Sequence, residues 1–158
     1  MNAASGVWHT CKTAIPRVLA AGNGGSIIIT SSGAGLRASQ NIGHYVASKH
    51  GVVGLMRTLA LELAADYIRV NTIHPATVET PMIMNDMMYR LFRPDPPEPT
   101  AEDAEVGFRQ LLAMPVPWVT PDDVTKVVLF LASDKALHHR CRAASRRWPT
   151  APVTGRVS

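Results

Sequence analysis

The stretch "GGSIIITSS", residues 24–32, decides the fold of this 158-residue chain. Its apolar residues are β-branched, glycines precede it, and apolar and polar residues do not alternate within it. An apolar run without alternation is typical of a strand that is buried on both faces, as in a parallel sheet. We therefore predict a parallel strand over residues 26–32, with Ser31 and Ser32 at its carboxyl end.

A helix and a second strand follow. From residue 45 to about residue 65, apolar residues recur at spacings of three and four, which predicts a helix with one buried face. The residues on that face are Val52, Leu55, Met56, Leu59 and Leu63. The next apolar run, "IRVNTIH" at 68–74, predicts a second buried strand that Pro75 ends.

Strand, helix and strand in this order indicate a parallel α/β sheet with a right-handed crossover. Such a sheet binds ligands at the carboxyl ends of its strands. We therefore expect Ser31, Ser32 and the loop "HPATVET", residues 74–80, to lie on the same edge.

Three further segments extend this pattern. Residues 7–21 predict a helix that contains Pro16. Residues 76–119 are rich in proline and methionine and resemble a lid or specificity insertion more than a linker. Thr120, followed by a proline and two aspartates, predicts the capped start of a further helix.

Composition excludes several classes of protein. With 46% hydrophobic and 18% charged residues, the chain is typical of a folded globular domain. No apolar run reaches about 18 residues, and the first 20 residues lack the pattern of a signal peptide. Cys11 and Cys141 form neither a disulfide framework nor a metal-binding spacing. We therefore expect no metal site and a cytoplasmic location.

The formal charge of +4 belongs to the C-terminal tail. Residues 1–136 hold 11 Lys and Arg against 12 Asp and Glu, whereas residues 137–158 hold five Arg and no acid. The body of the chain is thus near neutral, and we expect no nucleic-acid or membrane partner. The alternative is a nucleic-acid binder that uses the basic tail. It predicts an affinity that falls steeply with salt and is lost when the tail is deleted.

A tyrosine and a lysine at the start of the predicted helix suggest acid–base chemistry. Tyr45 and Lys49 are four residues apart, so they project from the same helix face. A tyrosine with its ordinary pKa of about 10 is a poor base at neutral pH, and a nearby ammonium lowers that pKa. Lys49 also has donors for a ribose hydroxyl. Ser32, at the strand end, can hydrogen-bond the oxygen whose proton Tyr45 transfers.

This pattern predicts proton exchange with an alcohol or a carbonyl, coupled to hydride transfer if a nicotinamide lies alongside. A tyrosine four residues before a lysine also occurs by chance in many helices. The upstream serine and the strand that ends in His-Pro make the combination more specific than the pair alone.

The runs "GGSIIITSSGAG", "YVASKHGVVGLMRTLALELA" and "IRVNTIHPATVETPM" closely resemble the short-chain dehydrogenase/reductase family. The resemblance covers roughly residues 6–136 and implies a Rossmann-type fold that uses NAD, with NADP as the alternative. It implies that Ser32 positions the substrate oxygen, that Tyr45 is the acid/base, and that Lys49 binds the nicotinamide ribose and assists Tyr45.

The same resemblance implies further cofactor and relay residues. Pro75, Val78 and Thr80 match positions that hold the nicotinamide carboxamide and a nearby phosphate. The family usually has glycine after that proline, where this chain has Ala76. Asn2 resembles a helix asparagine that supports a proton relay, although it stands four residues before Gly6 and the family pattern has three.

The segment "TPMIMNDMMYRLFRPDPPEPTAED", residues 80–103, resembles the mycofactocin-associated, carveol-dehydrogenase-like subgroup. That resemblance implies tightly held NAD and a small hydrophobic secondary alcohol or ketone as substrate. The family resemblance implies a homo-oligomer of the tetramer type, but we expect this chain to aggregate rather than to form a clean tetramer. The methionines of this segment suit an irregular apolar pocket, and they also suit a packed core. They are Met82, Met84, Met87 and Met88.

Two parts of the family pattern are missing. The sequence has neither the glycine-rich turn that binds the dinucleotide pyrophosphate nor the closing strand. One permitted set of codons for residues 137–148, read one nucleotide later, encodes "CITGAALPVDAG", which matches that closing strand. We therefore interpret residues 137–158 as an out-of-frame, disordered tail.

We accordingly expect an α/β fold, a partial Rossmann-like doubly wound parallel sheet that lacks the first strands and the last one. Residues 1–136 form this domain, with the insertion at about 76–119. The predicted function is NAD(P)-dependent oxidation of a secondary alcohol or reduction of a carbonyl, in a chain that is incomplete and weakly active or inactive. The alternative is a non-catalytic remnant that acts only in subunit interaction. Binding of NAD distinguishes the two.

Overall fold

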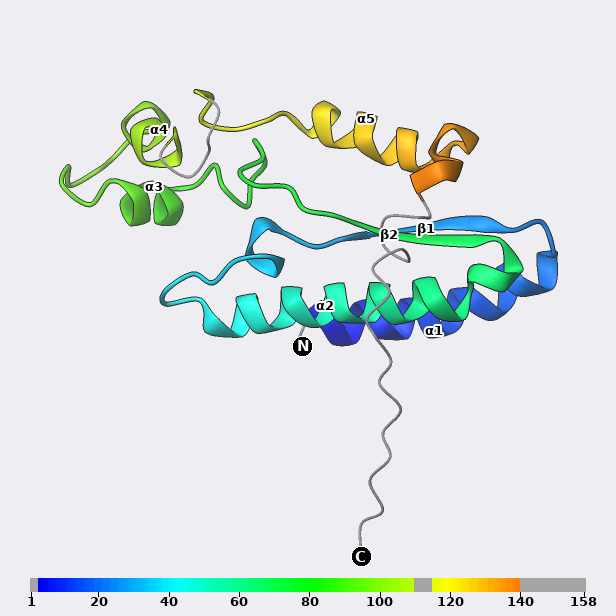
Figure 1. The fold of residues 1–158 in the computed structure, drawn as a ribbon. Helices are drawn as coiled ribbons and strands as arrows, with labels where there is room; N and C mark the ends of the chain where they lie inside the picture. Colours follow the sequence, from blue (N-terminus) through cyan, green and yellow to red (C-terminus); the bar gives the residue numbers. More distant parts are fainter. Residues whose placement is uncertain (1–2, 110–114, 140–158) are drawn as a thin grey trace, which may run out of the picture.

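The computed structural model describes residues 3–109 and 115–139, which form layers of helices on both sides of a small sheet (Figure 1). Figure 1 shows α1 and α2 on one side of the strands and α5 on the other. The elements in chain order are α1 (Ala3–Ala21), β1 (Gly25–Thr30), the 3-10 helix η1 (Gly33–Gly35), α2 (Gly43–Glu62), η2 (Ala64–Asp66), β2 (Ile68–Ile73), α3 (Asp86–Phe92), α4 (Ala101–Arg109), α5 (Pro121–Ala132) and η3 (Asp134–His139).

The two strands pair in parallel, as the sequence predicts. Their register runs from Gly25 opposite Ile68 to Thr30 opposite Ile73. Each strand ends one or two residues earlier than the apolar run indicates, and α2 forms the crossover between them. The α/β class and the parallel pairing are therefore confirmed for the described residues.

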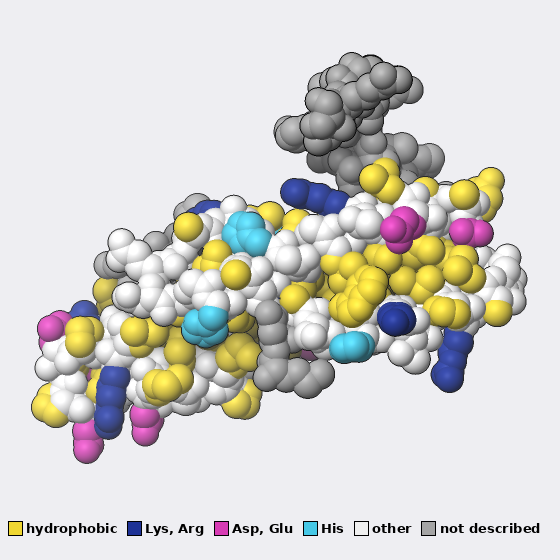
Figure 2. Space-filling model, turned by 90° about the horizontal axis from the view of Figure 1, so that it is seen from below, with side chains coloured by type: hydrophobic (Ala, Val, Ile, Leu, Met, Phe, Trp, Pro, Cys, Tyr) yellow, Lys and Arg dark blue, Asp and Glu magenta, His cyan; other side chains and the backbone are white. Residues whose placement is uncertain are grey.

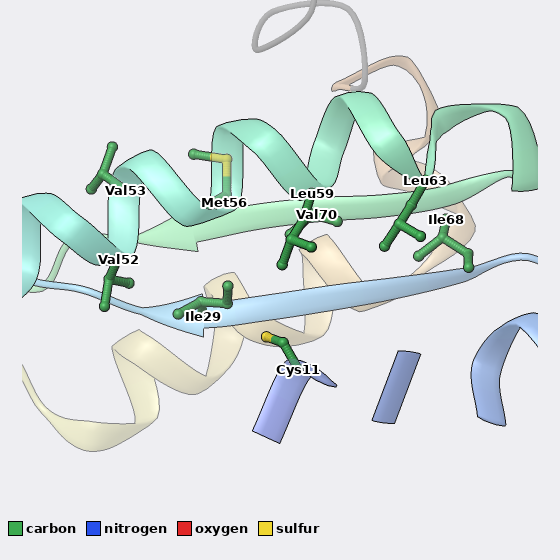
Figure 3. Close-up of a cluster of buried hydrophobic side chains, with 9 residues drawn as sticks. All are labelled: Cys11, Ile29, Val52, Val53, Met56, Leu59, Leu63, Ile68 and Val70. Atoms are coloured by element: carbon green, nitrogen blue, oxygen red, sulfur yellow. The ribbon is translucent and has the colours of Figure 1, made fainter. Parts of the chain in front are cut away.

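A cluster of buried side chains joins α1, α2 and the sheet (Figure 3). Its members are Cys11, Ile29, Val52, Val53, Met56, Leu59, Leu63, Ile68 and Val70. The residues from α2 recur at the predicted helical spacing, and Leu55 packs against the cluster as a partly buried residue. Burial of one such side chain contributes about 1.5–3 kcal/mol, so this stripe holds α2 in place on the sheet. The residues at the start of α2 are positioned by the same packing.

The strands differ in burial. In β2 four of the six residues are buried, whereas in β1 only Ile29 is, and Ile27 and Ile28 are half-buried. The expectation of a strand covered on both faces is thus met more fully by β2. In the described residues each strand has a neighbour on one edge only, so strand pairing does not account for the difference in burial.

Arg69, on β2, is a buried charge with 6% of its surface exposed. Its guanidinium donates hydrogen bonds to the carbonyls of Leu131, Ala132 and Ser133, where α5 ends. The Ser26 hydroxyl, on β1, donates to the Leu131 carbonyl over 2.9 Å. A helix C-terminus leaves carbonyls unpaired and carries partial negative charge, so a cation is favourable there. Arg69 and Ser26 thus attach α5 to the amino ends of both strands.

The two ends of the predicted insertion at 76–119 are hydrogen-bonded to each other through their main chains. Val78 and Val119 form an isolated parallel bridge, in which the Glu79 amide donates to the Val119 carbonyl over 3.0 Å. Figure 1 shows α3 and α4 beyond the carboxyl ends of the strands. The two helices pack through Phe92 and Phe108, whose ring centroids are 4.6 Å apart. The segment therefore has a small core of its own, and its role as a lid stays a prediction.

The predicted helix start at Thr120 is confirmed. The Asp123 amide donates to the Thr120 hydroxyl, and the Asp123 carboxylate accepts from the Thr120 amide, which is a capping box. Hydrogen bonds lower the pKa of Asp123 to about 2, with the largest contribution from the Lys126 ammonium and smaller ones from Thr120. Pro121 occupies the first turn, as expected.

Several predictions fall outside the described residues. Asn2 precedes Ala3, the first described residue. The predicted disordered tail, residues 137–158, lies outside the described residues from 140 onward, but residues 137–139 form the end of η3, so the tail does not begin where the sequence predicts. Within the part of the chain that the structure describes, no helix has the length and apolar character needed to cross a membrane. In the same residues, no group of His, Cys, Asp or Glu is arranged to hold a metal ion.

Replacing Arg69 tests the attachment of α5. We expect Arg69→Met to lower the free energy of unfolding by about 1–3 kcal/mol, because the carbonyls at the end of α5 lose the hydrogen bonds that the buried Arg69 side chain donates. Urea unfolding of both proteins measures this difference. Arg57→Met, on the exposed side of α2, is the matched control and should change stability by less than about 0.5 kcal/mol. Equal losses in the two variants would contradict the role of Arg69.

Candidate active site

The loops that leave the two strands are joined by backbone hydrogen bonds. Beyond the ends of β1 and β2, the Ser31 amide donates to the Ile73 carbonyl over 2.9 Å, and the Gly33 amide donates to the Pro75 carbonyl over 3.1 Å. The pairing of the strands thus continues into both loops. It brings Ser32 and Pro75 to the same edge, as the sequence predicts.

The two serines at the end of β1 have different surroundings. Ser31 is buried, and its hydroxyl donates to the Lys49 carbonyl over 3.2 Å. Ser32 is half-buried, and its Oγ accepts a hydrogen bond from the Ala34 amide over 3.2 Å, which caps η1. Because Oγ acts there as an acceptor, the Ser32 hydroxyl keeps its hydrogen for another oxygen.

Tyr45 and Lys49 lie one turn apart on α2, on the face that the spacing predicts. The Lys49 ammonium is over the Tyr45 ring, 5.7 Å from its centroid, which is within the range of a cation–π contact. The same ammonium donates to the Thr30 carbonyl over 3.1 Å. Lys49 is therefore fixed between the phenol and the end of β1, and both side chains are half-buried.

Gly35 lets η1 approach α2 closely. A Cβ at this position would lie 2.9 Å from the Lys49 carbonyl oxygen and would collide with the Ser31 hydroxyl. Only glycine fits this contact without movement of the loop that carries Ser32. In the sequence, the "GAG" after the two serines is the feature that points to this close approach, although it was noted above only as part of the family resemblance.

Ser48 and His74 are two further polar residues that sequence reasoning did not assign to the site. Ser48 is buried, and its hydroxyl accepts from the Ala4 amide over 3.2 Å, so it connects α2 to the start of α1. His74 places its ring between Thr72 and the Ser32 carbonyl. Two features of the sequence could have indicated these roles. Ser48 is a polar residue on an apolar helix, and His74 directly precedes Pro75 at the end of a strand.

The three residues expected to hold a nicotinamide lie on the loop that leaves β2. Pro75 accepts from the Gly33 amide, as described above, and Val78 forms the bridge to Val119. The Thr80 hydroxyl donates to the Val78 carbonyl over 3.3 Å. All three are half-buried and follow β2, on the same edge as Ser32.

Two surface hollows lie away from this edge. One, of about 590 Å³, is lined by residues of α1 such as Thr13 and Arg17. The other, of about 460 Å³, lies at the amino ends of the strands, where Gly25 and Arg69 line it. Neither includes Ser32, Tyr45 or Lys49. The candidate site is therefore defined here by its hydrogen bonds and by the contact between Lys49 and Tyr45.

Comparison with protein families gives the class of the chain. A family model described as Enoyl-(Acyl carrier protein) reductase matches residues 2–138. The chain therefore belongs to the short-chain dehydrogenase/reductase family. The family that the motifs around Ser32, Tyr45 and Lys49 indicate is confirmed, and the partial Rossmann-like fold is confirmed with it.

Individual relatives are similar over most of this chain. It is 54% identical over 132 residues to (-)-trans-carveol dehydrogenase of Rhodococcus erythropolis, covering 84% of this chain and 48% of the relative. It is 39% identical over 131 residues to cyclohexanol dehydrogenase of Acinetobacter sp., covering 82% of this chain and 44% of that relative. The crystal structure of carveol dehydrogenase from Mycobacterium avium in complex with NAD matches with a TM-score of 0.83 at 50% identity. The match covers 85% of this chain and 48% of the crystal structure's chain. The chain spans about half the length of these relatives.

Gly35→Ala tests the contact between η1 and α2. We expect this change to lower the free energy of unfolding by about 1–3 kcal/mol, because the added methyl group must displace η1 from the Lys49 carbonyl. Thermal unfolding measures the loss. Gly33→Ala is the control, since a Cβ there would meet only the Arg37 side chain at 4.0 Å. A Gly35→Ala variant as stable as Gly33→Ala would show that the contact is looser than described.

Proposed function

We propose that this site carries out NAD-dependent oxidation of a secondary alcohol and, in reverse, reduction of a carbonyl. The observation that carries the proposal is the position of the Lys49 ammonium over the Tyr45 ring, beside the loop that presents Ser32. Family membership supports the same chemistry. Because the chain covers about half of its relatives, the activity of the whole protein remains part of this proposal.

Each of the three residues has a distinct role in the proposal. The Ser32 hydroxyl donates a hydrogen bond to the substrate oxygen, which the free hydrogen on Oγ allows. The Tyr45 phenolate takes the proton from that oxygen during oxidation and returns it during reduction. The Lys49 ammonium favours the phenolate electrostatically, since opposite charges at short range stabilise each other.

The donor set of Lys49 fits the nicotinamide ribose of NAD. An ammonium has three donors, and the described contacts use one of them, on the Thr30 carbonyl. The remaining donors can bind the ribose hydroxyls, and Pro75, Val78 and Thr80 can hold the carboxamide end and a phosphate. NADP stays the alternative cofactor. When bound, the nicotinamide supplies the acceptor for the hydride that leaves the alcohol carbon.

The adenosine and pyrophosphate half of such a cofactor has no matching site in residues 3–109 and 115–139. Neither strand there leads into a glycine-rich turn at the start of a long helix, which is the usual pyrophosphate site. We therefore propose that the 158-residue chain by itself binds NAD weakly and has little or no turnover. The alternative, a non-catalytic chain that acts only in subunit interaction, predicts no turnover even when the rest of the fold is supplied.

For the substrate we propose a small hydrophobic secondary alcohol or ketone. The two curated relatives compared above are named for cyclic alcohols, carveol and cyclohexanol. In this chain Met82, Met87 and Leu91 expose 75%, 74% and 65% of their surface in the segment that follows the site loop. Apolar, adaptable side chains at that place suit an apolar substrate.

Finer assignments belong to the same proposal. They are membership of the mycofactocin-associated subgroup, a cytoplasmic location, a homo-oligomer in the family that this chain by itself does not form, and the absence of nucleic-acid and membrane partners. The motif "TPMIMNDMMYRLFRPDPPEPTAED" supports the subgroup, and the near-neutral charge of residues 1–136 argues against nucleic acid. Cys11, a buried free thiol, is compatible with a reducing compartment.

Binding of NAD to the full chain tests the missing half of the cofactor site. We expect NAD at about 1 mM to leave the melting temperature of the 158-residue protein unchanged, because a ligand stabilises only in proportion to its binding. Differential scanning fluorimetry measures the melting temperature. Saturable binding of NAD at micromolar concentrations would show that the described residues are sufficient for the cofactor.

Turnover can be tested in a chimaera that sets residues 3–136 between the end segments of the Rhodococcus carveol dehydrogenase. We expect it to oxidise carveol with NAD and Tyr45→Phe to lower kcat by about 10²–10⁴-fold, since general acid–base catalysis contributes that much. The rate of NADH formation measures both. Tyr67→Phe, next to the amino end of β2, is the control and should keep its activity. A fully active Tyr45→Phe chimaera would refute the acid–base role, and an inactive parent chimaera would favour the non-catalytic alternative.

A further inference from the structure

His74 connects the end of β2 to the loop that carries Ser32. The Nδ1 atom lies 2.9 Å from the Ser32 carbonyl oxygen, and the Nε2 atom lies 2.9 Å from the Thr72 hydroxyl. The ring is half-buried. Neither the acid–base chemistry nor the cofactor contacts proposed above use this side chain.

The chemistry of the partners decides which nitrogen carries the hydrogen. A carbonyl oxygen only accepts, so Nδ1 must be the donor toward Ser32. In the neutral ring Nε2 is then an acceptor, and the Thr72 hydroxyl donates to it. Thr72 therefore holds the ring in the orientation that directs Nδ1–H at Ser32.

Hydrogen bonds to the Ser32 carbonyl and to the amides on either side of Ser32 fix the main chain at this residue. Its carbonyl accepts from the Gly35 amide over 2.9 Å as well as from His74. The flanking amides donate to the other loop and its strand, that of Ser31 to the Ile73 carbonyl and that of Gly33 to the Pro75 carbonyl. With the main chain fixed in this way, the Ser32 side chain stays where Oγ meets the Ala34 amide.

We propose that His74 is a positioning residue, whose Nδ1–H sets the orientation of the Ser32 hydroxyl for the substrate oxygen. The relevance of that orientation to catalysis rests on the function proposed above, but the orientation itself is a property of this chain. Pro75 contributes, because the residue before a proline is restricted to extended backbone, which directs the ring from β2 toward the neighbouring loop. His74 itself transfers no proton in this scheme.

Two substitutions separate the donor from the bulk of the ring. In His74→Asn the side-chain amide nitrogen stands at the same bond separation from the backbone as Nδ1, so the donor to Ser32 is kept. In His74→Gln the nitrogen is one bond farther out, nearer the former Nε2, so the donor to Ser32 is lost. Both variants remove the ring, so a merely structural role would affect them alike.

Nuclear magnetic resonance of the full 158-residue chain provides the readout. We expect the imidazole of the unmodified protein to be in the Nδ1–H form and the Ser32 side chain to occupy one rotamer. His74→Asn should keep that rotamer, whereas His74→Gln should average it and speed exchange of the Ala34 amide about fivefold to tenfold, the effect of losing one net hydrogen bond. Thr72→Val should loosen the ring and give a smaller change in the same direction.

The outcomes are distinct. An Nε2–H ring, or a Ser32 rotamer that is unchanged in His74→Gln, would overturn the inference. Equal loss of the rotamer in the Asn and Gln variants would also overturn it, because the ring and not the donor would then be the cause. In the chimaera, His74→Gln should lower kcat about tenfold with little change in KM, and His74→Asn should not. An inactive parent chimaera counts against the proposed function alone, since the resonance measurements decide the positioning.

Discussion

The parallel pairing of β1 and β2 is the constraint on which the site depends. Each strand ends at the same edge because the register is in step from Gly25 opposite Ile68 onward. The pairing continues past the strands through the Ser31 and Gly33 amides, so the two loops that follow are held as one unit. A shift of this register would separate the Ser32 loop from the loop that begins at His74.

The apolar face of α2 adds the third side of the site. Burial of residues such as Val52 and Leu59 against the sheet holds the helix, and the polar residues of its first turns take their places from that packing. Ser31 and Gly35 then set the distance between the loop and the Lys49 turn. The lysine is thereby kept near the Tyr45 ring. Figure 2, seen from below, shows yellow hydrophobic side chains gathered on the outer surface of the α1 and α2 layer.

The order of the elements places the candidate site in the described residues without the pyrophosphate site of a complete Rossmann fold. The residues proposed for proton transfer and for the nicotinamide end follow β1 and β2 or lie on α2, all within the described part of the chain. The pyrophosphate site of a Rossmann fold lies at a different strand end, on a glycine-rich turn. Because the chain spans about half the length of its relatives, it can hold one set of residues without the other.

The sequence by itself determined the strand–helix–strand order with its flanking helices, the parallel strands, the cap at Thr120 and the pair formed by Tyr45 and Lys49. The helices α3 and α4, inside the predicted insertion, were not among its predictions. Hydrophobic periodicity and local capping chemistry act over a few residues, so they can be read directly from the chain. Only the tertiary structure showed that Arg69 donates hydrogen bonds to the carbonyls at the end of α5 and that His74 is hydrogen-bonded to the Ser32 carbonyl. Those contacts join residues 62 and 42 positions apart, and no local pattern specifies the partner of a buried polar group across such a separation.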